Sequence, residues 1–112
     1  MNLNLKQIME LLEVDERVAK EVLDIMEKSN FDFSESSMEE FQQEASYCFR
    51  DLLLSKISNL VGCNMHTASE VYVLLQKDGV DIFKPNSWEF EKSVKGNYLH
   101  LLVEREKNND KA

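Results

Sequence analysis

The chain has 112 residues, of which 43% are hydrophobic and 30% are charged, and its formal net charge is −8. This length suits one domain with a substantial core, no apolar run approaches the roughly 20 residues of a membrane span, and no export signal opens the chain. Two cysteines are too few for a disulfide scaffold. We therefore expect a cytoplasmic protein with reduced thiols.

The negative charge is unevenly distributed along the chain. Residues 5–53 contain thirteen acidic and five basic residues, whereas residues 54–112 contain eight of each. An excess of negative charge repels nucleic acid and membrane surfaces, and it favours a basic protein partner or simply solubility. An electrostatic interaction is therefore expected from the first half of the chain.

The first half begins with a helical pattern. Apolar residues at three- and four-residue steps predict helices near 4–13 and 16–29. Asp15 is placed to accept a hydrogen bond from the free amides that open the second of these helices. The loop that follows has an apolar residue on each side of an Asp at 31–33, and this alternation is typical of an extended segment.

A capping box predicts where the third helix begins. Ser37 is followed three residues later by Glu40, and nothing interrupts the helical pattern over 38–61. Asn64 then resembles Asp15 as an N-cap, so a fourth helix is expected near 65–78.

The last predicted helix is the least regular. Asn86 and Glu89 predict a capping box for a helix near 87–106, and Gly96 weakens that helix enough to be a candidate break. Residues 108–112 are expected to form a frayed polar tail.

The two halves are repeats of one another. Residues 5–53 align without a gap with residues 54–102 at an offset of 49, and the recurring positions are mostly apolar, as a buried pattern would be. We therefore predict an all-α fold with five helices in a single domain, 1–107, whose two helix-turn-helix-like units share the long central helix. The loops at 31–33 and 80–82 are candidates for a short two-stranded β contact.

About twenty residues of the second unit resemble the helix-turn-helix of DNA-binding proteins. Gly62 takes the place of the turn glycine and Ser58 that of the small residue four positions earlier, whereas the first unit has Glu13 in place of the glycine. In such motifs the second helix enters the major groove. The resemblance implies nucleic-acid contacts by Lys56, Asn64, His66, Thr67, Ser69 and Tyr72. The exposed face of that helix lacks arginine and lysine, so DNA binding would be weak and sensitive to salt.

No catalytic motif accompanies these units. The glycines are isolated, which excludes a phosphate-binding loop, and there is no nucleophile elbow. Cys63 and His66 have a ligand-like spacing, with Cys48 and His100 as further zinc-ligand candidates, but the repeat aligns Cys63 with Val14, an inward position. We therefore predict no enzyme activity, no metal and no cofactor.

The last predicted helix has more apolar surface than a surface helix needs. It is apolar nearly all round from Leu99 to Val103 except at His100, and Trp88 stands near its start. A homodimer or a partner contact is therefore a further expectation.

The function that we predict is a non-enzymatic interaction or regulatory protein whose acidic first unit binds a basic surface of a protein partner. Carboxylates three or four residues apart on a helix lie about 5–6 Å from one another, close to phosphate spacing, so nucleic-acid mimicry is a specific version of this prediction. Small inhibitors carried by phages or mobile elements are similar in this respect. The alternative is a DNA-binding regulator that uses the helix at 65–78. The candidate partner contacts are Glu10, Glu13, Glu16, Asp24, Glu27, Glu35, Glu39 and Glu44.

Overall fold

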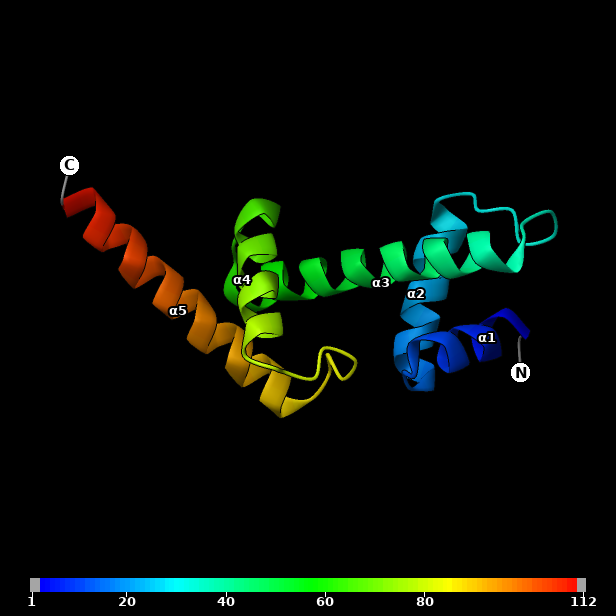
Figure 1. Ribbon diagram of the computed structural model, residues 1–112, viewed down its shortest axis with the longest axis horizontal. Helices are drawn as coiled ribbons and strands as arrows, with labels where there is room; N and C mark the ends of the chain where they lie inside the picture. Colours follow the sequence, from blue (N-terminus) through cyan, green and yellow to red (C-terminus); the bar gives the residue numbers. More distant parts are fainter. Residues whose placement is uncertain (1–2, 111–112) are drawn as a thin grey trace. The chain divides into compact units, whose positions relative to one another are not determined.

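The computed structural model describes residues 3–110, with side chains as far as Lys107. These residues form five helices and no strand, so the all-α prediction is confirmed. None of the described helices is both long and apolar enough to cross a membrane. The helices, shown in Figure 1, are α1 (Leu3–Leu12), α2 (Glu16–Lys28), α3 (Met38–Val61), α4 (Met65–Lys77) and α5 (Trp88–Asp110).

The predicted bounds of the first four helices agree with the structure to within one residue at each end, but α5 is longer than expected. It continues without a break through Gly96 as far as Asp110, where the sequence predicts an end near residue 106 and a polar tail from 108. The side-chain amide of Asn97 donates to the Ser93 carbonyl at 2.9 Å, so this residue bonds within the helix. Residues 111–112 of the predicted tail lie outside the described residues.

Two N-cap side chains occupy equivalent positions in the repeats. Asp15 accepts a hydrogen bond from the Val18 amide at 2.9 Å, and Asn64 accepts one from the Thr67 amide at 2.8 Å. Their backbone angles are nearly equal, with φ −75° and ψ 172° at Asp15 and φ −77° and ψ 171° at Asn64. The predicted capping roles of both residues are confirmed.

Left-handed residues follow the helix ends at matching positions. Glu13 after α1 and Gly62 after α3 have φ values of 54° and 69°, and Asn30 after α2 and Gly79 after α4 have φ values of 60° and 72°. This conformation allows the next amides to bond back to the helix, as a Schellman-type end requires. Glycine adopts it freely, whereas Glu13 must adopt it with a side chain.

Packing divides the chain into two compact units, with the boundary between Leu52 and Leu53, inside α3. In the first unit α1 packs on α2, and in the second α4 packs on α5. Several of the most deeply buried positions recur at the offset of 49, as a buried repeat pattern predicts. These pairs, all fully buried, are Ile8 and Ile57, Ala19 and Ala68, Val22 and Val71, and Met26 and Leu75.

The capping box predicted for α3 is confirmed, but the N-cap predicted for α5 is wrong by one residue. At α3 the box is present: the Glu40 amide donates to Ser37 Oγ at 3.1 Å, and the Ser37 amide donates to Glu40 Oε1 at 3.4 Å. At α5 the Phe90 amide donates to Ser87 Oγ at 3.2 Å, so Ser87 is the cap and Asn86 is not. The loop before α5 is one residue longer than its counterpart before α3, and this shifts the cap.

The two-stranded contact predicted for 31–33 and 80–82 is not formed, because neither segment contains a strand. Asp32 Oδ1 accepts hydrogen bonds from the amides of Ser34 at 3.0 Å and Glu35 at 3.1 Å. Asp81 Oδ1 likewise accepts from the Phe83 amide at 3.0 Å. These side chains satisfy neighbouring backbone amides and turn the chain just after each Asp.

Candidate functional site

The acidic residues predicted to bind a partner come from every segment of the first unit. Seven of the eight are exposed, and Glu44 is half-buried. Glu10 lies on α1 and Glu13 in the turn after it, while Glu35 lies in the loop before α3. Glu16, Asp24 and Glu27 lie on α2, and Glu39 and Glu44 lie on α3.

The exposed side of α2 is mixed in charge. Arg17, Lys20 and Lys28 lie on the same exposed side as the α2 carboxylates, and Lys20 Nζ is 3.6 Å from Glu16 Oε1. Bases interleaved with acids cancel most of the local field. This helix therefore contributes little to a purely acidic surface.

A more uniform acidic surface runs along α3, and sequence reasoning found only one of its members. Glu40, Glu44, Tyr47 and Asp51 follow one another at steps of four, three and four residues, which places them on one side of the helix. Tyr47 is 66% exposed and stands between the carboxylates. We call these four residues the Tyr47 face. The helical spacing is visible in the sequence and is the signal that would have identified the other three.

The buried thiol of Cys48 lies beside the Tyr47 face and is affected by the negative charge of the carboxylates there. Cys48 Sγ donates to Glu44 Oε1 at 3.6 Å. Burial, followed by the negative charges of Glu44 and Asp51, raises the pKa of Cys48 to about 12. The thiol is therefore neutral at physiological pH, so it is unsuited to act as a nucleophile or a metal ligand.

The loop before α3 has its own carboxylate. The Ser34 hydroxyl, and after it the amides of Glu35 and Ser34, donate to Asp32 and hold the pKa of its carboxyl below the usual value of 3.8. The rings of Phe31, Phe33 and Phe41 pack edge to face beside it, with centroids 5.2–6.3 Å apart. The loop therefore keeps its negative charge while its aromatic side chains hold it on α3.

The nucleic-acid candidates do not form a free reading surface on α4. Thr67 is only 5% exposed, which contradicts its predicted exposure, because Arg105 of α5 covers it with guanidinium nitrogens 3.3 Å from its hydroxyl. Its repeat partner Val18 is also buried, and this alignment could have predicted the burial. Glu70 places a carboxylate on the same helix, 2.9 Å from Arg105 and 3.1 Å from His66 Nε2.

The remaining nucleic-acid candidates have other roles or partial burial. Asn64 is the N-cap of α4, and Ser69 and Tyr72 are half-buried. His66 is exposed, as the sequence predicts for a surface histidine. Lys56 lies on α3 and donates from Nζ to Asn86 Oδ1 at 3.1 Å. These residues are therefore not gathered on one helix face.

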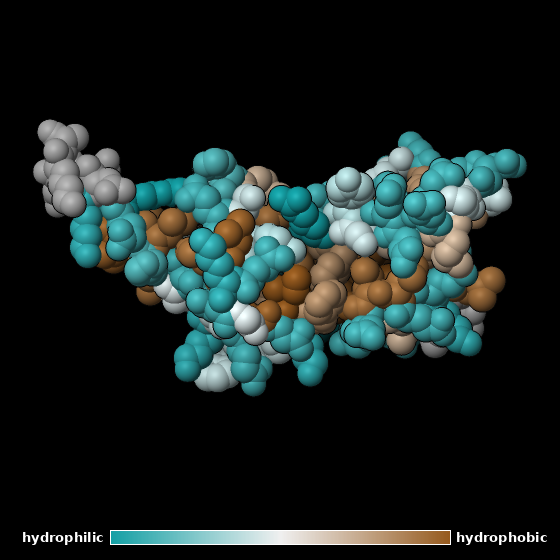
Figure 2. Space-filling model, viewed as in Figure 1, coloured by the Kyte–Doolittle hydropathy of each residue, from teal (hydrophilic) through white to brown (hydrophobic). Residues whose placement is uncertain are grey.

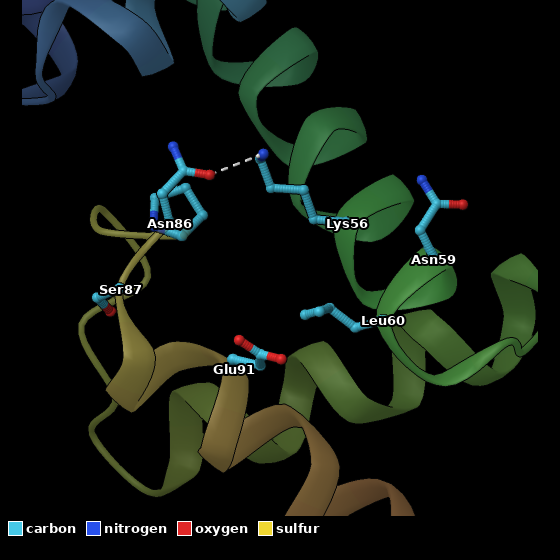
Figure 3. Close-up of a pocket in the computed structure, with 7 residues that line it drawn as sticks. Lys56, Asn59, Leu60, Asn86, Ser87 and Glu91 are labelled. Atoms are coloured by element: carbon cyan, nitrogen blue, oxygen red, sulfur yellow. Dashed lines mark hydrogen bonds between the residues drawn. The ribbon is translucent and has the colours of Figure 1, made fainter.

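A shallow groove in the second unit surrounds the hydrogen bond between Lys56 and Asn86 (Figure 3). It has a volume of about 360 Å³ and is lined by Leu60, Pro85 and five polar residues, which are Lys56, Asn59, Asn86, Ser87 and Glu91. In Figure 3 the Lys56 side chain reaches Asn86, whereas Asn59 points away from the other labelled side chains. The groove is open to solvent. Nowhere in the described part of the chain do three His, Cys, Asp or Glu side chains gather to hold a metal ion.

No protein-family model matches this chain, and neither a curated protein nor a solved structure is similar enough to match it.

Proposed function

We propose that this protein is a non-enzymatic binding protein whose first unit engages a basic surface of a protein partner through the Tyr47 face. The observation that carries the proposal is the exposed Tyr47 ring, 66% accessible, with Glu40, Glu44 and Asp51 on the same side of α3. Tyrosine is enriched among the residues that dominate binding energy, because its ring buries much area at a small entropic cost.

Charge supports a basic partner. Residues 5–53 carry thirteen acids against five bases, so the whole excess of negative charge belongs to the first half of the chain. Such a field raises the rate of encounter with a positively charged surface, and it disfavours acidic partners. The exposed carboxylates outside the Tyr47 face, among them Glu10, Glu35 and Glu39, extend this field around it.

The DNA-binding alternative has less support. Neutralised phosphates provide most of the affinity of a protein for DNA. The helix that would enter the groove carries Glu70, and the guanidinium of Arg105 bonds to Glu70 and Thr67 of that helix. Nucleic-acid mimicry remains a narrower form of the proposal, since Glu40 and Glu44 are one helical turn apart.

A pull-down with matched charge variants tests the proposal. Glu40→Gln, Glu44→Gln and Asp51→Asn together should reduce retention of a basic partner from a cell lysate by about tenfold at physiological salt, as should Tyr47→Ala alone. The control is Asp78→Asn, Glu89→Gln and Glu104→Gln, which removes the same three charges from exposed positions of the second unit. This control should retain the partner.

Two further results would distinguish a defined binding face from an effect of net charge, and nucleic-acid mimicry from other kinds of binding. Equal loss of the partner in both triple variants would show that only net charge matters and would refute a defined face. Displacement of the partner by duplex DNA added to the wild-type complex would favour the mimicry version, because a mimic occupies the site at which its partner binds nucleic acid.

A further inference from the structure

The outer side of α5 carries a row of exposed large side chains. Trp88, Leu99 and Val103 are 67%, 61% and 49% exposed. Together with Lys92 they fall within roughly 60° of one another around the helix and extend about 22 Å along it. We call these four residues the α5 face. Phe90 and Val94, which are fully buried within the unit, lie on the opposite side of the helix. Brown, hydrophobic surface also appears along the α5 end in Figure 2.

Gly96 borders this face in the interior of the helix. A glycine there destabilises the helix by about 1 kcal/mol relative to alanine. Apart from its chain neighbours and the backbone of its own helix, no heavy atom lies within 4 Å of where its Cβ would be, so packing within the chain does not require glycine. A missing side chain beside an apolar row allows the backbone of another helix to approach closely.

The repeat gives independent evidence that α5 lacks a cover. Leu102 is half-buried, whereas Leu53, its partner at the offset of 49, is fully buried. Leu102 is therefore less covered than its repeat partner.

The charges along this side of α5 complement those of a second copy in reversed direction. Lys92 and Glu106 lie seven residues before and after Leu99, and both are exposed on its side of the helix. An antiparallel pair centred on Leu99 brings Lys92 of each copy opposite Glu106 of the other, whereas a parallel pair opposes Lys92 to Lys92. The second half of the chain has eight acids and eight bases, so it adds no net repulsion.

We infer that the α5 face binds a second copy of this chain, forming a symmetric dimer with antiparallel α5 helices. In this arrangement Leu99 meets Leu99 and Lys92 meets Glu106, so these positions are self-complementary, as a twofold interface requires, while exposed Lys95 at the edge of the face lies opposite Val103. Lys92 Nζ lies 5.0 Å from the centre of the Trp88 ring, so the cation is already held beside the apolar row.

Sedimentation velocity over chain concentrations from about 1 μM to about 1 mM measures the dimer directly. The expected species at high concentration has twice the mass of the 13.1 kDa chain. Leu99→Glu should weaken association at least tenfold, because two carboxylates would then meet at the centre of the interface. Lys92→Glu should weaken it roughly tenfold, and adding Glu106→Lys to that variant should restore the wild-type affinity to within about twofold.

Val73→Glu is the matched control, since Val73 is 46% exposed on α4 and should leave association unchanged. Circular dichroism should show the same helix content for every variant, because all the altered side chains are exposed. A wild-type chain that is monomeric throughout the concentration range would overturn the inference. So would a dimer that Leu99→Glu leaves intact, or a charge reversal at 92 that Glu106→Lys fails to rescue.

Discussion

At the scale of single residues, the backbone conformation decides what a position tolerates. Gly62 and Gly96 both have open space where a Cβ would lie, yet Gly62 has a φ of +69° and Gly96 is helical. An added methyl group is therefore strained at the first position and unstrained at the second. The sequence identified Gly62 as a helix end, but only the structure shows that nothing within the chain needs Gly96.

Alanine at the two glycines should change stability in opposite directions. Gly62→Ala should lower the free energy of unfolding by about 1 kcal/mol, and Gly96→Ala should raise it by about 0.5–1 kcal/mol. Urea unfolding followed by circular dichroism at micromolar concentration measures both. A loss of stability on Gly96→Ala would mean that α5 is not a regular helix at this point.

The two cysteines should differ in reactivity. The pKa of Cys48 is raised to about 12, so the neutral thiol is favoured in the folded state, and its contribution to stability is full below the usual value of 9.0 and is lost as the pH rises toward 12. Iodoacetamide at about pH 8 should therefore label the half-exposed Cys63 and leave the buried Cys48 unmodified until urea is added. Mass spectrometry of the peptides distinguishes the sites, and equal labelling in the folded state would contradict the burial of Cys48.

At the scale of helices, local sequence signals predicted most of the fold, because periodicity and caps act within a few residues. The N-caps Asp15 and Asn64 are examples. Contacts between distant residues could not be read this way. The Lys56–Asn86 hydrogen bond joins residues 30 apart, and it involves the side chain to which the sequence assigned the α5 cap. The contact between Arg105 and Thr67 also joins two helices and could not be read this way, although the alignment of Thr67 with Val18 could have indicated that Thr67 is buried.

The same substitution should have different effects on stability in the packed core and at the wall of the groove. Val71→Asp should abolish the cooperative thermal transition, because Val71 is fully buried on α4 and a lone buried carboxylate costs several kcal/mol. Leu60→Asp should lower the melting temperature and keep the transition, because Leu60 is half-buried beside the open groove. The sequence alone predicts unfolding for both. A cooperative transition in Val71→Asp would contradict the alignment of the repeats.

At the scale of the whole molecule, the two repeats have similar interiors and different surfaces. Most of the fully buried positions match at the offset of 49, whereas the acidic excess belongs to the first half and the exposed apolar row of α5 to the second. The charge asymmetry could be counted from the sequence. The spacing of the carboxylates along α3 could also be read, but the exposure of Tyr47 between them is known only from the structure.

Site-specific photo-crosslinking locates the partner most directly. A benzophenone side chain in place of Tyr47 should crosslink a basic protein in cells, and the same group at Val73, exposed to 46% on α4, should not. Crosslinks from position 47 that decline when Glu40, Glu44 and Asp51 are neutralised would support the Tyr47 face as the binding surface. Crosslinks from Val73 alone, or an acidic protein captured at position 47, would contradict it.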